Sequence, residues 1–81
     1  MPLPGLPTGS APSPDEELWR LTKGRRVAVC WQRVHPLGLE LRLDVNGDTM
    51  RTTVERTEQA AREQSAYMRQ AMLDKGWSAE S

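Results

Sequence analysis

Residues 38–54 read GLELRLDVNGDTMRTTV, and this stretch decides the fold. Its first half alternates leucine or valine with charged residues, which is the period-2 pattern of a half-buried strand. Asn46-Gly47 follows, the dipeptide that best tolerates the positive φ angles of a two-residue type I′ turn. Met50, Thr52 and Val54 then resume the alternation. The stretch predicts a β-hairpin, and nothing in it points to a particular activity.

The turn also predicts the register of this hairpin. A two-residue turn places Leu43 opposite Met50, whereas a slip by one residue would set threonines and an arginine against the leucines. On the other face, the same register sets Arg42 directly opposite Arg51. Like charges in that position are destabilising unless neighbouring acids or an outside anion compensate them. The second face is therefore a candidate binding surface.

Residues 26–34 predict another strand, which has Trp31 on one side and Cys30 on the other. His35-Pro36-Leu37-Gly38 is typical of a type I turn, with proline at its second position and glycine at its fourth. A glycine there commonly closes a three-residue loop as a β-bulge, which would pair His35 with Leu39. On that register Trp31 lies on the leucine face and points into the core.

Residues 15–23 have two interpretations. Ser13-Pro14-Asp15-Glu16 has the composition of a helix-capping box. Against a helix, Trp19 and Leu21 alternate with polar residues and lead into the turn signal Lys23-Gly24. We favour a strand over residues 17–22, joined to the next strand by a loop over residues 23–25.

Residues 58–75 predict a helix with a thin apolar stripe. Thr57 can cap its N-terminus, and Gly76 is a good residue to follow its C-terminus. Trp77 can then fold back on Met72 in a Schellman-type contact.

The elements together predict an α+β domain: a four-stranded antiparallel β-meander (ββββα) with one C-terminal helix packed on one face. This single domain spans residues 15–77. Residues 1–14 contain five of the six prolines and no charged side chain, which indicates a disordered Pro-rich N-terminal tail. We expect residues 78–81 to fray.

A scattered pattern accompanies these elements. It consists of Trp19-x-Leu21-x-Lys23-Gly24-x-Arg26, then Cys30, then Pro36-x-Gly38-x-Glu40-x-Arg42, and finally Lys75-Gly76-Trp77. In this pattern the chain resembles a set of short bacterial proteins. The resemblance covers roughly residues 18–77, and it implies a bacterial origin and a strand for the first element. It implies no activity.

Composition narrows the class of protein. Eleven basic and eleven acidic residues cancel, which argues against a protein dedicated to coating nucleic acid. The chain has a single cysteine, so no intramolecular disulfide is possible and a reducing compartment is favoured. Residues 1–14 have no basic region and their prolines interrupt any hydrophobic run, so we do not expect them to act as a signal peptide. No apolar stretch approaches the roughly 20 residues of a membrane span. These features predict a cytoplasmic protein that does not contact a membrane.

The sequence offers little for catalysis. His35 precedes a proline in a tight turn, where a structural role is the simpler interpretation. Cys30 lies mid-strand, where Arg42 and Gln32 could be near, but a passive sheet cysteine is the simpler interpretation. The chain carries no metal-binding spacing and no glycine-rich phosphate loop. We therefore expect no enzymatic activity, no cofactor and no metal.

The sequence best fits a small non-enzymatic protein–protein interaction module that associates with itself as a homodimer. The alternative is a nucleic-acid-binding protein that uses a basic open sheet face. Self-association is favoured by the small core, the exposed Met and Tyr side chains of the helix and the two free edges of the sheet. The candidate binding residues, which would meet an anion or an acidic partner, are Arg42, Arg51, Gln32, Arg33, Arg25 and Arg26.

Overall fold

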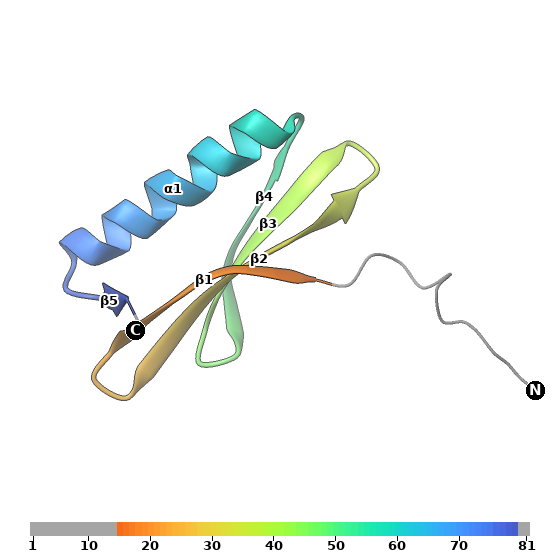
Figure 1. Ribbon diagram of the computed structural model, residues 1–81. Helices are drawn as coiled ribbons and strands as arrows, with labels where there is room; N and C mark the ends of the chain where they lie inside the picture. Colours follow the sequence, from red (N-terminus) through yellow and green to blue (C-terminus); the bar gives the residue numbers. More distant parts are fainter. Residues whose placement is uncertain (1–14, 80–81) are drawn as a thin grey trace, which may run out of the picture.

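The computed structural model describes residues 15–79, which form an antiparallel sheet with one helix lying across one of its faces (Figure 1). The elements in chain order are β1 (Glu16–Lys23), β2 (Arg26–His35), β3 (Gly38–Val45), β4 (Asp48–Glu55), α1 (Glu58–Asp74) and β5 (Ser78–Ala79). Their order in the sheet is β4-β3-β2-β1-β5. The predicted α+β meander is confirmed, and so is the strand, rather than a helix, for the first element. The predicted tail at 1–14 lies outside the described residues.

Helix α1 begins and ends as its flanking residues predict. The Thr57 hydroxyl accepts a hydrogen bond from the Ala60 N–H at 3.0 Å. At the other end, the Trp77 N–H donates to the Met72 carbonyl at 3.1 Å, and Gly76 adopts a φ of 100°. These are the features of a Schellman motif, which satisfies carbonyls that the helix end would otherwise leave without partners.

The chain does not fray directly after this motif. Ser78 and Ala79 pair with Thr22 and Leu21 of β1 and form the short strand β5. This pairing differs from the expectation that the chain frays from residue 78 onward, and residues 80–81 of that prediction lie outside the described residues. Trp77 is buried against Leu21 and Ala28, and this contact holds the end of the chain against the sheet edge.

The core lies between α1 and the sheet, and small side chains line much of it. One cluster contains Cys30, Leu41, Ala61 and Met68, and a second contains Leu21, Ala28 and Trp77. Alanine and cysteine under the helix allow close approach of the two layers, which dense interior packing requires.

The predicted placement of Trp31 in the core is wrong. His35 pairs with Gly38 rather than with Leu39, so the connection between β2 and β3 is one residue shorter than expected. Because side chains alternate along a strand, this shift exchanges the two faces of β2. Cys30 therefore lies under the helix, and Trp31 lies opposite Arg42 on the other face.

The short connection depends on Gly38. This residue has a φ of 148°, and a Cβ atom placed on it would lie 2.1 Å from the Glu55 carbonyl oxygen. Only glycine allows the end of β4 to pass this close to the start of β3.

The predicted register between β3 and β4 holds near the turn and fails beyond it. Asp44 pairs with Thr49 as expected, but the next pair is Leu43 with Arg51. Met50 is thus the extra residue of a β-bulge. Beyond the bulge, Arg42 lies opposite Thr52, so the predicted like-charge pair of Arg42 and Arg51 does not form.

Strand β1 contains a second bulge, at Leu18. Glu17 pairs with Trp31 and Trp19 with Cys30, which leaves Leu18 as the additional residue. Leu18 and Trp19 both pack against the core cluster that contains Cys30. The predicted loop at 23–25 is also shorter in the structure, since Lys23 pairs directly with Arg26.

Candidate functional site

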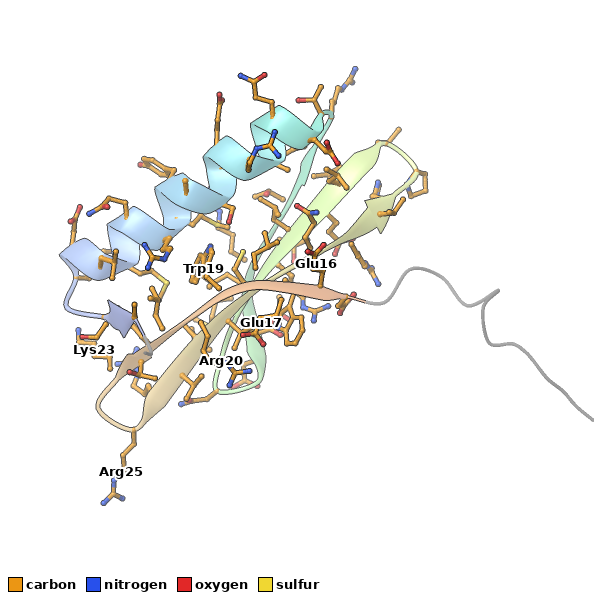
Figure 2. All side chains as sticks on the ribbon, viewed as in Figure 1. Glu16, Glu17, Trp19, Arg20, Lys23 and Arg25 are labelled. Atoms are coloured by element: carbon orange, nitrogen blue, oxygen red, sulfur yellow. The ribbon has the colours of Figure 1, made fainter. Side chains whose placement is uncertain are left out.

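The six predicted binding residues do not converge on one surface. We use the term open face for the side of the sheet opposite α1. Arg42 and Arg33 lie on the open face, whereas Arg51 and Gln32 pair with Leu43 and Leu41 and share the helix side. Arg25 occupies the turn between β1 and β2 and projects away from the end of that hairpin (Figure 2).

Arg42 is the centre of a charge cluster on the open face. Its guanidinium donates to Asp15 Oδ2 at 2.9 Å and, through Nε, to Asp44 Oδ1 at 3.2 Å. Thr49 donates to the same Asp44 oxygen at 2.9 Å. Partial burial alone would lower the pKa of Arg42, but the two carboxylates outweigh this effect and raise that pKa. The positive charge of Arg42 is thus already compensated by carboxylates of the same chain.

Trp31 lies beside this cluster. The guanidinium carbon of Arg42 is 5.9 Å from the centre of the indole ring, within the range of a cation–π interaction. In the lateral row across the sheet, Trp31 has Glu17 as its neighbour on β1 and Arg42 as its neighbour on β3. An aromatic side chain on the open face is a feature that the sequence-based register missed.

The remaining charges on the open face are also paired. Arg33 contacts Glu40 at 3.2 Å, and Arg20 forms a two-point ion pair with Glu17, with a shortest distance of 2.9 Å. The hydrogen bond from Arg20 lowers the pKa of Glu17. The bulge at Leu18 makes this pair possible because it brings residues 17 and 20 to the same face.

Two basic residues stabilise the end of the helix rather than forming a site. The guanidinium carbon of Arg26 lies 5.0 Å from the centre of the Trp77 ring. Lys23 Nζ donates to the Lys75 carbonyl oxygen at 2.8 Å, at the C-terminus of α1. The contact of Lys23 places positive charge where the helix macrodipole is negative.

Neither candidate nucleophile is arranged for catalysis. Cys30 is fully buried, and this burial raises its thiol pKa to about 11 despite a hydrogen bond with Ser65. A thiol with such a pKa is protonated at neutral pH and is a poor nucleophile. His35 Nδ1 accepts a hydrogen bond from the Leu37 N–H at 3.0 Å, so it supports the β2–β3 turn. Within residues 15–79, no three His, Cys, Asp or Glu side chains cluster as a metal site requires.

No protein-family model, curated protein or solved structure gives a match to this chain. Its surfaces must therefore be judged on their own geometry. No helix in the described part of the chain is long and apolar enough to cross a membrane.

A groove lies on the helix side, between the first half of α1 and the start of β1. It has a volume of about 430 Å³. Its walls combine apolar and charged side chains: Leu18 and Trp19 from β1, Gln32 from β2, and Arg62 and Ser65 from α1 contribute to the lining. The Trp19 indole N–H donates to Ser65 Oγ at 2.8 Å, which fixes the two walls together. The groove therefore lies along the contact between the two layers, and this hydrogen bond joins its two walls.

Strand β4 lies at an edge of the sheet formed by the described residues. Strand β4 pairs with β3 on one side, and no described element pairs with it on the other. Met50 is 64% exposed and Val54 is 40% exposed on this strand. An edge strand with apolar side chains and unpaired backbone groups can accept another strand.

Proposed function

We propose that this domain is a non-enzymatic interaction module that associates with a second copy of itself. The observation that carries the proposal is the exposed edge of β4. Its outward N–H and C=O groups can form a ladder with another strand, and Met50 and Val54 supply apolar surface beside that ladder. A chain of this length buries a smaller share of its surface than a larger domain does, so association would add stability.

The opposite edge of the sheet is protected, which directs association to β4. Strand β5 covers part of β1 at Leu21 and Thr22, and the bulge at Leu18 interrupts the remainder. Short covering strands and bulges are common means of blocking an edge. Residues 51–55 of β4 contain no proline, lysine or bulge.

Nucleic-acid binding through Arg42, Arg51 and Arg33 has less support. Two of these arginines already contact carboxylates, and the third lies on the other side of the sheet. Phosphate groups would have to compete with those internal ion pairs. Trp31 on the open face is the one feature in favour, because single-strand binders stack bases on aromatic side chains.

Light scattering during size-exclusion chromatography tests the proposal over a range of concentrations. The expected mass at high concentration is twice the chain mass of 9.1 kDa. Val54→Lys should shift the protein toward monomer, whereas Val34→Lys should not, because Val34 is more exposed than Val54 but lies on β2 near the β2–β3 turn, away from the edge of β4. A monomer at every concentration would overturn the proposal. Binding to nucleic acid that strengthens as salt falls would favour the alternative.

A further inference from the structure

We infer that two copies join through β4 in an antiparallel ladder. Its two-fold axis passes midway between the Thr53 residues of the two copies, which lie opposite each other. This inference rests on the proposed self-association and specifies its register. Each sheet would continue into the other, and the two β4 strands would lie at the centre of the combined sheet.

The face of each β4 side chain restricts the possible registers. Arg51, Thr53 and Glu55 pair with leucines of β3 and therefore lie on the helix side. Thr52 and Val54 lie on the open face. Directly opposed residues in a sheet share a face, so a symmetric pairing must place one residue opposite itself.

The length of the regular strand selects the central residue. The bulge at Met50 interrupts regular pairing at one end, and the strand ends at Glu55. Residues 51–55 are thus the regular part of β4, and their midpoint is Thr53. Only a two-fold axis at Thr53 pairs this whole segment with its copy.

Charge complementarity selects the same register. With the axis at Thr53, Arg51 lies opposite Glu55 of the second copy, and the symmetry repeats this ion pair on the other side. Moving the axis to Thr52 sets Arg51 opposite Thr53, and moving it to Arg51 opposes two like charges. Opposite charges directly across a ladder stabilise it.

The Thr53 hydroxyl gives a third and independent indication. Among the buried side-chain oxygen and nitrogen atoms of the described residues, Thr53 Oγ1 has no hydrogen-bond partner. Buried polar groups normally have such a partner. In the inferred register the two Thr53 side chains face each other, and rotation about Cα–Cβ lets one hydroxyl donate to the other.

Two variants that reverse the charge of Arg51 or of Glu55 test this register, first alone and then mixed. Arg51→Glu and Glu55→Arg should each weaken self-association on the order of tenfold, because each opposes like charges at both sites. An equimolar mixture of the two variants should recover the dimer mass, since every pair is then of opposite charge. Recovery also shows that both variants are folded. If each variant remains dimeric alone, or the mixture stays monomeric, the register is wrong.

Cross-linking separates failure of the register from failure of self-association. Cys30 is buried, so a cysteine introduced on β4 is the one expected to form a cross-link. Under mild oxidation Thr53→Cys should form a disulfide-linked dimer, and Thr49→Cys on the same strand should not. Suppose that the native protein is dimeric by light scattering, but Thr53→Cys gives no cross-link and the charge exchange has no effect. The proposed self-association then stands, and the register is wrong. A native protein that is always monomeric overturns both.

Discussion

Arg42 lies directly opposite Trp31 on the neighbouring strand, with its guanidinium carbon 5.9 Å from the centre of the indole ring. Asp15 and Asp44 hold the same guanidinium in place. A large aromatic side chain can therefore remain on the side of the sheet that lacks the helix, because a cation covers part of its surface. Like Arg42, the open-face arginines Arg20 and Arg33 contact carboxylates of the same chain.

Replacing Arg42 should cost more stability than replacing an ordinary surface arginine. Arg42→Gln removes an ion-pair cluster and a cation–π contact, and we expect a loss of about 1 kcal/mol in the free energy of unfolding. Arg33→Gln breaks one exposed ion pair and should cost less than about 0.5 kcal/mol. Urea denaturation, monitored by tryptophan fluorescence, measures the free energy of unfolding of both variants. Equal losses would show that the cluster around Arg42 adds nothing beyond a single pair.

The elements of this fold could be predicted because each depends on local chemistry. Asn46-Gly47 indicates its turn by backbone preference, and Thr57 and Gly76 mark the ends of α1 in the same way. These signals lie within a few residues of the structure that they specify. The β-meander followed by a helix is consequently confirmed, and the short strand β5 is the element that was not predicted.

The faces of the strands could not be predicted with the same success because they depend on single-residue shifts. A turn one residue shorter than expected at Gly38 reverses β2, and a bulge at Met50 reverses the end of β4. The adjacent apolar residues Leu18 and Trp19 did carry a signal for the bulge in β1, since they break the alternation. Met50 carried no such signal. The prediction that Arg42 and Arg51 share a face was therefore wrong.

Gly38 should be far less tolerant of substitution than a turn glycine. An alanine Cβ at Gly38 would clash with the backbone at Glu55, so we expect Gly38→Ala to destabilise the protein by more than about 3 kcal/mol. Gly47 also has a positive φ, but a Cβ there meets nothing within 4 Å. Gly47→Ala should cost only about 1 kcal/mol for the backbone conformation. Thermal unfolding of both variants checks the difference, and similar losses would contradict the close approach of β3 and β4.

Trp77 should be essential for folding although it lies outside the helix. It is 6% exposed and packs against Leu21 and Ala28, so Trp77→Ala should cost about 3–5 kcal/mol. That loss approaches the total stability of a small domain. Tyr67→Ala is the matched control, since Tyr67 is exposed on α1 and should change stability by less than about 0.5 kcal/mol. Circular dichroism of the two variants distinguishes a lost fold from a local change, and a well-folded Trp77→Ala protein would show that the second core cluster is dispensable.

Cys30 should react with thiol reagents only when the protein unfolds, and its ionisation should limit stability at high pH. Burial raises the thiol pKa from 9.0 to about 11. The folded state therefore holds its proton more tightly than the unfolded state does. This contribution to stability is fully present below pH 9 and is lost as the pH rises toward 11. Denaturation of the native protein and of Cys30→Ala at pH 8 and pH 10.5 isolates the effect, because the variant should lose less stability between the two values. Rapid labelling of native Cys30 at pH 7 would contradict its buried position under α1.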